Sequence, residues 1–332
     1  MRKRIVGQKS NQRNVLKIPR PVSLREFYQR KDKIVIIRAV GGLGDILIHR
    51  MMFEDFKRID PDIKIVFATL PCYFDAVKDH PFVDEVVNSD KIDLADYNIS
   101  YNTTSACNRY EIAMSPYSGL NRSDIWANHC GVELKHHNMH LRVSPESMEY
   151  GKNTVDYYRQ THKGPIVLLC PISAMIAKNL LDWQIEGVIK ELRNMNCFVL
   201  ASHVGPVSKL IEMDVPIIRT TILQLFGLTS ACDYIISVDT AQIHVAGGLK
   251  KPTVGIFTFA DGLVYCQNYP TVTVVQKHRA LDPQWICGPC YNWPNCTKTN
   301  AIPKPCLTEI TVGMIIGAVK KMMKKYPQST IL

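Results

Sequence analysis

The stretch that decides the fold is KIVIIRAVGGLGD, residues 33–45. Its first part, Ile34–Ile37, is a short run of apolar, β-branched residues, which is typical of a strand buried on both faces of a parallel sheet. The glycine-rich turn Gly41–Asp45 follows, and apolar residues then recur at helical spacing from Ile46 to Ile59. A buried strand, a glycine turn and a helix in this order predict the first βαβ unit of an α/β protein.

The alternation of strand and helix continues and then starts a second time. Strands are predicted over Ile63–Ala68 and Val83–Val87, with a short helix over Tyr73–Lys78, whereas residues 96–145 are less regular. A hydrophilic stretch, residues 144–163, precedes the second start. Beyond it the pattern predicts strands at Ile166–Cys170, Phe198–Ser202, Tyr234–Val238 and Thr253–Phe257, and helices at Trp183–Met195, Leu223–Cys232, Ala241–Leu249 and Thr308–Lys325.

The domain organisation follows from this restart. A chain of 332 residues is too long for one ordinary core and suits two domains of roughly 150 residues each. Two α/β halves form a cleft, with ligand loops at the carboxyl ends of their strands. The predicted parts are a basic N-terminal arm at 1–33, a first α/β domain at 34–150, a linker at 151–163, a second α/β domain at 164–307 with a cysteine-rich loop at 287–306, and a C-terminal helix at 308–332.

The net charge of +10 is concentrated at one end of the chain. Residues 1–33 contain eleven Lys or Arg and two acidic residues, so the remainder is nearly neutral. Such an arm favours anionic surfaces, lipid headgroups or nucleic acid, although a solvated, partly disordered leader fits its composition equally well. No run of about 18 apolar residues predicts a membrane span, and no apolar segment follows the basic start to make a secretory signal. We expect a cytoplasmic protein, and the arm would allow peripheral contact with a membrane surface.

Two loops carry candidate site residues. Gly41–Asp45 lies between a buried strand and a helix, where glycine permits positive φ and the helix N-terminus favours anions. Asp45 fits either a helix cap or a carboxylate held at the cleft for base chemistry. Asp239–His244 also follows a buried strand and opens a helix, so the backbone amides of Thr240 and Ala241 suit a diphosphate.

Together these loops resemble the signature of family 9 glycosyltransferases, the ADP-heptose:lipopolysaccharide heptosyltransferases and their relatives. The resemblance runs in order over most of residues 33–320. It is carried by IVIIR at 34–38 with GLGD at 42–45, HPFVDEV at 80–86, DTAQIHVA at 239–246 and KPTVGIF at 251–257.

The resemblance implies a GT-B fold (α/β), with two Rossmann-like domains facing across a cleft, an acceptor domain at 34–150 and a nucleotide-sugar domain at 164–307. It also implies an inverting reaction that needs no cofactor or metal for catalysis. The implied partners are a nucleotide-diphosphate sugar, with an ADP-sugar favoured, and an anionic glycan or lipid-linked acceptor. Asp45 is the implied general base, and Lys178 would neutralise the leaving diphosphate. The other implied site residues are Asp239, Thr240, Ala241, Gln242 and His244 for the nucleotide sugar and Gly41, Gly42 and Gly44 for the acceptor-side loop.

This sequence departs from the family pattern at three places. The usual Gly-Pro after Asp-Thr is Ala241-Gln242, and the usual Phe-Gly-Pro-Thr after the next strand is replaced at Phe257–Ala260. The tryptophan expected two residues after Lys178 is displaced to Trp183. The first change keeps the backbone amide, the second leaves the base and the sugar open, and the third leaves the role of Lys178 open.

Four cysteines close to the C-terminus form a C-x₂-C-x₅-C-x₉-C set: Cys287, Cys290, Cys296 and Cys306. Four thiolates can bind zinc or iron tetrahedrally, and such a site would be structural because all four positions are filled. In a protein expected to be cytoplasmic a metal is favoured over disulfides, with four reduced thiols as the alternative.

Two other functions fit the same residues. A GT-B enzyme acting on DNA or protein would use the basic arm, but no basic patch interleaved with aromatic residues supports nucleic-acid binding. A non-catalytic member that binds a nucleotide sugar would explain the departures at Ala241-Gln242 and Phe257–Ala260. The main hypothesis is an inverting glycosyltransferase acting on a bacterial surface glycan such as the lipopolysaccharide core.

Overall fold

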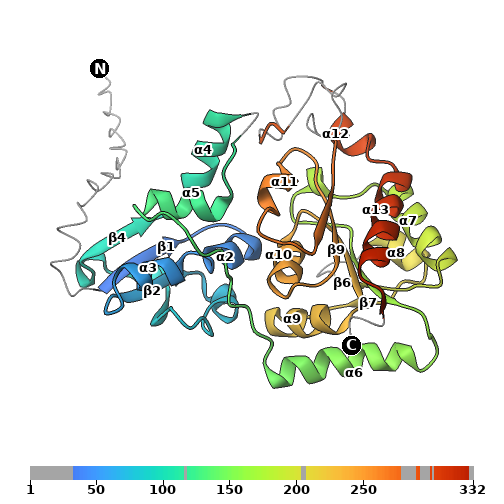
Figure 1. Cartoon of the computed structure of the whole chain (residues 1–332), viewed down its shortest axis with the longest axis horizontal. Helices are drawn as coiled ribbons and strands as arrows, with labels where there is room; N and C mark the ends of the chain where they lie inside the picture. The colour runs from blue at the N-terminus through green and yellow to red at the C-terminus, as the bar shows by residue number, and fades with distance from the viewer. Residues whose placement is uncertain are drawn as a thin grey trace, which may run out of the picture. The chain divides into compact units, whose positions relative to one another are not determined.

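The computed structural model describes residues 33–115, 118–202, 207–277, 289–291, 300 and 303–328. Its described strands form two separate parallel sheets (Figure 1), as the two runs of alternating strands and helices predict. The first sheet has the order β3-β2-β1-β4 and the second has the order β10-β9-β8-β5-β6-β7. We call the parts built on these sheets the N-terminal and the C-terminal domain.

The N-terminal domain is organised around strand β1, which pairs with β2 and β4. The run of β-branched residues places Ile34, Val35 and Ile36 fully inside the domain. The elements of this domain are β1 Lys33–Arg38, α2 Leu43–His49, α3 Phe53–Ile59, β2 Lys64–Thr69, η1 Pro71–Ala76, β3 Glu85–Asn88, η2 Ser89–Lys91, η3 Leu94–Asp96, β4 Ile99–Asn102, α4 Ala106–Met114 and α5 Arg122–His129.

One predicted helix is divided in two. The apolar spacing predicts a single helix from Ile46 to Ile59, but α2 ends at His49 and α3 begins at Phe53. In between, the amides of Arg50 and Met51 donate to carbonyls three residues back rather than four, at 3.2 and 3.1 Å. The guanidinium of Arg50 is completely buried and donates to Met139 O, Ala76 O, His140 O and Asp79. These contacts are with residues distant in the sequence, so the spacing of apolar residues does not predict the break between α2 and α3.

The C-terminal domain contains the larger sheet and most of the remaining helices. Its elements are β5 Ile166–Cys170, η4 Ile176–Lys178, α7 Asp182–Asn194, β6 Phe198–Ser202, α8 Ser208–Glu212, β7 Ile217–Ile218, α9 Ile222–Ala231, β8 Tyr234–Val238, α10 Ala241–Gly248, β9 Thr253–Ile256, α11 Gly262–Tyr265, β10 Val272–Val275, α12 Pro305–Thr308 and α13 Val312–Lys325. The strands β4, β7 and β10 were not predicted, because each is short and lies at a sheet edge, so none has the long apolar run of a central strand.

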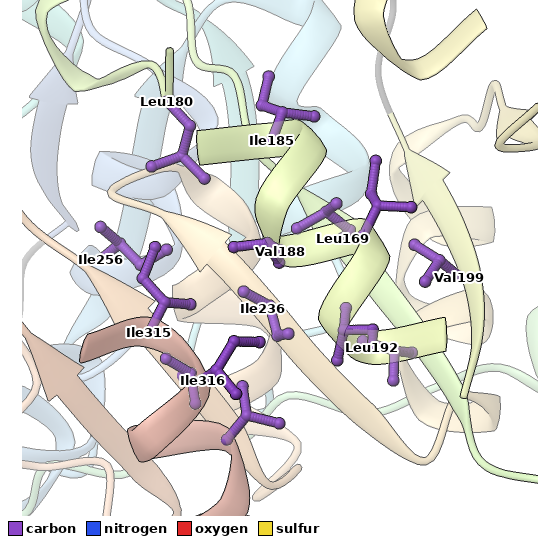
Figure 2. Packing of buried hydrophobic residues seen from close by; sticks show 14 of the residues in the cluster. Leu169, Leu180, Ile185, Val188, Leu192, Val199, Ile236, Ile256, Ile315 and Ile316 are labelled. Carbon is purple, nitrogen blue, oxygen red and sulfur yellow. The ribbon is translucent and has the colours of Figure 1, made fainter. Parts of the chain in front are cut away.

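The core of the C-terminal domain fixes the position of its final helix. Ile185 and Val188 of α7 and Ile315 of α13 belong to one hydrophobic cluster with Ile236 and Ile256 of the strands (Figure 2). Each such side chain contributes about 1.5–3 kcal/mol when it is fully buried. Helix α13 is therefore an integral part of this domain.

Helix α6, Pro145–Arg159, joins the two domains and contains much of the hydrophilic stretch at 144–163. It begins where the Ser144 side chain accepts a hydrogen bond from the amide of Ser147. It runs along α9 (Figure 1), and Val155 belongs to a core cluster with Leu228 and Cys232. The helix is thus packed on the C-terminal domain along its length.

Candidate active site

The two loops singled out in the sequence lie in one cleft. Gly41–Asp45 follows β1 of the N-terminal domain, and Asp239–His244 follows β8 of the C-terminal domain. The cleft between them has a volume of about 1040 Å³. Every predicted sugar-transfer residue lines it: Gly41, Gly42, Gly44, Asp45, Lys178, Asp239, Thr240, Ala241, Gln242 and His244. Residues separated by some 200 positions in sequence are therefore brought together at the carboxyl ends of two parallel sheets.

Glycine is required in the first loop for two geometric reasons. Gly41 has a φ of +135°, and a Cβ there would lie 2.6 Å from Arg38 Nη2 and 2.8 Å from Asp45 Oδ2. A Cβ on Gly44 would lie 2.9 Å from Cδ2 of His244 in the other domain. The loop thus combines a strained backbone with close approaches to the carboxylate and to the opposite loop.

Asp45 is held by two arginines and does not cap its helix. The N-cap of α2 is Gly42, which has no side chain to make the capping hydrogen bond. Arg38 Nη2 donates to Asp45 Oδ2 at 2.6 Å, and Arg122 Nη1 donates to Asp45 Oδ1 at 2.9 Å. Burial on its own would raise the pKa of Asp45, but the charges of Arg122 and Arg38 outweigh it and lower the pKa to about 2. Asp45 is therefore an oriented, ionised carboxylate at neutral pH.

Three residues that the sequence did not single out complete this network. Arg122 makes a two-pronged pair with Glu111, Nε to Oε1 and Nη2 to Oε2, both at 2.8 Å. The hydroxyl of Tyr265 donates to Glu111 Oε1 at 2.7 Å. Glu111 and Arg122 come from the irregular segment 96–145 and carry no motif. Arg38, in contrast, ends the strand β1 three residues before Gly41, so its place in the sequence was a usable signal.

The second loop has the features of an anion site. Thr240 is the N-cap of α10, and its side chain accepts from the amide of Gln242 at 3.2 Å. The first amides of a helix have no intrahelical acceptor, and they point with the positive end of the helix dipole at whatever lies in front. Lys178 Nζ lies 2.7 Å from Asp239 Oδ2 and is only one-fifth exposed. A lysine and a helix N-terminus therefore face the same part of the cleft.

His244 is a neutral group in this loop. Its Nδ1 lies 3.0 Å from the hydroxyl of Tyr269, and the residue is buried. Burial lowers the pKa of His244 to about 4. The side chain is thus uncharged at neutral pH, and it contributes a hydrogen bond and shape to the cleft rather than a positive charge.

Gln242 stands where the family pattern has proline. Its Nε2 donates to Thr229 Oγ1 at 2.7 Å, and that hydroxyl in turn donates to Leu225 O at 2.6 Å. The side chain is therefore turned towards helix α9 and helps to hold α10 against it. The change replaces a residue without an amide proton by one whose side chain joins two helices.

The cleft is flanked by hydrogen bonds between the domains. Asn121 Nδ2 donates to Val264 O at 2.9 Å and to Tyr265 O at 3.0 Å. Ser115 Oγ donates to Cys290 O at 3.0 Å. The start of α5 in the N-terminal domain is thus attached to α11 in the C-terminal domain, directly beside Asp45.

The four-cysteine set lies only partly within the described residues. Cys290 and Cys306 are half-buried, whereas Cys287 and Cys296 lie outside the described residues. Within the ranges that the structure describes there is no group of three or more potential metal ligands. The metal site therefore stays a prediction.

Comparison with known proteins identifies the family to which this chain belongs. The model of glycosyltransferase family 9 (heptosyltransferase) matches residues 107–279, more than half of the chain. The chain belongs to this family, and its two parallel α/β domains are the GT-B fold that the sequence resemblance implies.

The relatives agree with this assignment. The lipopolysaccharide core heptosyltransferase OpsX of Haemophilus influenzae is 23% identical over 211 residues, a match that spans 59% of this chain and 58% of OpsX. ADP-heptose LPS heptosyltransferase II of E. coli superposes with a TM-score of 0.60 at 14% identity, covering 88% of this chain and 99% of its own. The iron-containing heptosyltransferase TibC of E. coli, in complex with ADP-D-beta-D-heptose, gives a TM-score of 0.65 at 13% identity, covering 90% and 78%.

Two expectations about location concern features outside the cleft. Of the basic arm predicted at 1–33, residues 1–32 lie outside the described part of the chain. Its last residue, Lys33, begins β1. Of the helices that the structure describes, none combines the length and the apolar character needed to span a bilayer.

Proposed function

We propose that this chain is an inverting glycosyltransferase that moves a heptose or similar sugar from an ADP-sugar to a hydroxyl of a bacterial surface glycan such as the lipopolysaccharide core. The observation that carries the proposal is the placement of Asp45 across one cleft from Lys178 and the N-terminus of α10. Family membership and the lipopolysaccharide core heptosyltransferase OpsX support the reaction class. The ADP-heptose complex of TibC supports the donor.

The C-terminal domain would bind the donor. The amides of Thr240 and Ala241 at the start of α10 would donate hydrogen bonds to the diphosphate, which would lie at the positive end of the helix dipole. Lys178 has three N–H donors, so it can keep its ion pair with Asp239 and still reach a phosphate oxygen. Positive charge placed there stabilises the diphosphate as it leaves.

The N-terminal domain would present the base. Each oxygen of Asp45 accepts one arginine N–H, whereas a carboxylate has about four lone-pair positions. One position on each oxygen therefore stays available for an acceptor hydroxyl. In the transfer step the hydroxyl oxygen attacks the anomeric carbon from the face opposite the diphosphate, and its proton passes to Asp45. The bond from the anomeric carbon to the diphosphate oxygen breaks, its electron pair leaves with that oxygen, and the configuration inverts.

The residues that line the cleft also indicate the chemical character of the acceptor. The charged side chains of the cleft are three of each sign, so the net charge of the lining does not by itself select an anionic acceptor; they are Arg38, Arg122, Lys178, Asp45, Glu111 and Asp239. Apolar side chains at its edge, Val40, Ile112 and Met175, are 59%, 56% and 42% exposed. We propose an amphipathic acceptor, an anionic glycan or its lipid-linked precursor, which the basic residues of 1–33 would help to hold at the cytoplasmic face of the inner membrane.

The test is a transfer assay with ADP-heptose and a heptose-free lipopolysaccharide core acceptor. Release of ADP and the anomeric proton coupling in the product are measured by chromatography and NMR. The expected result is acceptor-dependent release of ADP with an inverted anomeric centre. A product with retained configuration, or release of ADP that does not depend on the acceptor, would contradict the proposal. Asp124→Asn is the matched control, because this carboxylate pairs with His137 and does not line the cleft.

We further propose that the four cysteines hold a structural zinc or iron ion outside the catalytic steps. The donor set is suited to such an ion, and TibC is an iron-containing member of the same structural group. Metal analysis of the purified protein should give about one equivalent for a mononuclear tetrahedral site. The double variant Cys287→Ser/Cys290→Ser should lose that metal, and a metal content unchanged by it would contradict the proposal.

A further inference from the structure

Arg122 lies between Asp45 and the C-terminal domain. One side of its guanidinium donates to Asp45 Oδ1, and the other side makes the two-pronged pair with Glu111. We propose that Arg122 is a positioning residue, which fixes the orientation of the Asp45 carboxylate while the two domains are docked through Glu111 and Tyr265. This inference rests on the proposed function, because it assigns a role to Arg122 in presenting the base.

The geometry around Arg122 restrains the guanidinium from two sides. Tyr265 covers the planar group, with its ring centre 4.8 Å from Cζ of Arg122, and its hydroxyl donates to Glu111 Oε1 at 2.7 Å. The three side chains therefore form a closed triangle of contacts. Glu111 is 2% exposed and Tyr265 is 4% exposed, so these interactions operate in an environment of low dielectric constant, where they are stronger than in water.

The triangle contains one member from the other domain. Tyr265 ends α11, the short helix that follows the cleft-lining residues Phe259 and Ala260 in the C-terminal domain. Directly before Arg122, the side chain of Asn121 bonds to two carbonyls of α11 and also caps α5 by accepting from Ser123 N at 3.0 Å. The position of Arg122 therefore depends on the contact between the N-terminal and the C-terminal domain.

Asp45 needs this second restraint. The other arginine, Arg38, is fixed in the N-terminal domain by bonds to Thr103 O and Thr104 O and lies over Trp126. Arg38 binds only Oδ2, so on its own it would let the carboxylate turn about its Cβ–Cγ bond, and Arg122 on Oδ1 removes that freedom. A base must be held within hydrogen-bonding reach of the acceptor hydroxyl, because misplacement by about 1 Å can cost 10²-fold in rate.

The electrostatic surroundings of Asp45 are contributed by both domains. The titratable and charged groups that face it or interact with it are Arg38, His49, Tyr73, Cys107, Glu111, Arg122, His244 and Tyr265. Arg38 and Arg122 are the only ones of these that carry a positive charge at neutral pH, because burial keeps His49 and His244 neutral by lowering the pKa to about 3 and about 4.

The test compares Arg122→Gln, Arg122→Lys and Tyr265→Phe with the wild-type protein. For Arg122→Gln we expect kcat to fall on the order of 10²-fold, with the KM for ADP-heptose changed little. Loss of one positive neighbour raises the pKa of Asp45, so the acid limb of the kcat/KM profile moves to higher pH. Arg122→Lys keeps the charge and should keep the acid limb near its wild-type position, although it loses the fork on Glu111 and therefore part of kcat.

Tyr265→Phe tests the dependence on the other domain. It keeps the ring on Arg122 and removes only the hydrogen bond to Glu111, so kcat should fall about tenfold, as the loss of a hydrogen bond to a charged group implies. The matched control is Tyr234→Phe, a buried tyrosine whose hydroxyl donates to Tyr326 O, away from the cleft. This control should leave kcat and the pH profile unchanged.

A second readout does not depend on activity. The carboxyl carbon of Asp45, assigned by its loss in Asp45→Asn, is titrated by NMR, and its pKa should rise in Arg122→Gln and stay low in Arg122→Lys. An unchanged titration in Arg122→Gln, or a plateau value of kcat in this variant equal to or above that of the wild type, would overturn the positioning role. A Tyr265→Phe variant that behaves like Tyr234→Phe would overturn the link to the C-terminal domain. If the wild type transfers no sugar, the proposed function fails, and the titration still decides the role of Arg122.

Discussion

The loops Gly41–Asp45 and Asp239–His244 are built from the same local unit and carry different chemistry. Each follows a buried parallel strand and opens a helix that contains a buried histidine, which is the last residue of α2 (His49) and the fourth residue of α10 (His244). In the second loop the side chain of Thr240 caps the helix, and the helix N-terminus faces the cleft. In the first loop the cap position is a glycine without a capping side chain, and the only carboxylate of that turn is bound to arginines instead.

This difference shows how one backbone unit can serve two functions. A loop that binds a diphosphate through backbone amides needs few particular side chains, because every residue except proline has the amide proton. A loop that presents one carboxylate needs that side chain, room for it, and partners that hold it. We therefore expect the acceptor-side loop to be sensitive to substitution at Gly41 and Asp45, and the donor-side loop to tolerate changes such as the one at Ala241.

Among the substitutions on the donor side of the cleft, that of Lys178 should lower activity the most. Lys178→Met removes the cation beside the leaving diphosphate and leaves the buried Asp239 without this ion pair. Hydrogen bonds to charged groups contribute about 1.5–3 kcal/mol, so kcat/KM for the ADP-sugar should fall about 10–150-fold. Steady-state kinetics with varied donor measures this. The control is Lys190→Met, which breaks an exposed pair with Glu186 on α7. A fall of less than threefold would remove Lys178 from the donor site.

A substitution at Gly41 tests whether the first loop depends on its backbone. Gly41→Ala forces a side chain into positive φ and against Arg38 and Asp45. The free energy of unfolding should fall by about 1–3 kcal/mol, with a matching fall in Tm. Gly42→Ala is the matched control, since a Cβ there meets no atom within 4 Å. Equal Tm values for the two variants would show that the first loop is not constrained as described.

The buried histidines of α2 and α10 predict how stability depends on pH. Burial lowers the pKa of His49 to about 3 and of His244 to about 4, from an ordinary value of 6.5. The unfolded chain therefore takes up protons first as the pH falls below about 6.5, so the stability contributed by these groups is present above that pH and is lost as the pH falls towards 4 and then 3. Urea unfolding at pH 7.5 and pH 5 should show this loss, and His244→Gln should reduce it. A His244→Gln protein with the wild-type pH dependence would contradict the assignment.

One histidine in the N-terminal domain, His137, changes the stability with pH in the opposite direction. The hydrogen bond to Asp124 raises the pKa of His137, so its contribution to stability is present at low pH and is lost as the pH rises through that pKa. The variant His137→Gln should therefore make the acid loss of stability steeper. The same unfolding experiment measures both effects and separates the two signs.

The smallest effect is expected at Ala241. Ala241→Gly restores the residue of the family pattern and keeps the amide proton that the proposed diphosphate site uses. Binding of ADP should stay within about threefold, while the glycine costs about 0.5–1 kcal/mol of stability. Isothermal titration calorimetry with ADP measures the affinity. A large change in affinity would mean that the side chain of Ala241, rather than its backbone, shapes the site.

Much of the fold could be predicted from the sequence because the central strands are continuous runs of buried residues. Residues 34–37, 166–170 and 234–238 all lie in strands at or near the places predicted. The edge strand β4 could not be predicted, since Ile99–Asn102 has only four residues and two of them are polar. The break between α2 and α3 depends on the contacts of Arg50 with distant carbonyls, which no local pattern records.

The site divides in the same way. Both loops were visible because a glycine turn or a capping residue after a strand is a local signal. Arg122 and Glu111 were missed because their roles depend on contacts with residues 77 and 154 positions away in the sequence, Asp45 and Tyr265. Residue type alone does not distinguish a buried Arg–Glu pair in a cleft from an ion pair on the surface.

The central claim is that Asp45 acts on the acceptor and Asp239–His244 on the donor. The most direct test measures ADP binding and single-turnover transfer of heptose in Asp45→Asn. The account predicts an ADP affinity within about twofold of the wild type and a transfer rate lower by about 10²–10⁴-fold, which is the usual contribution of a general base. A transfer rate within a few-fold of the wild type, or loss of ADP binding, would contradict it.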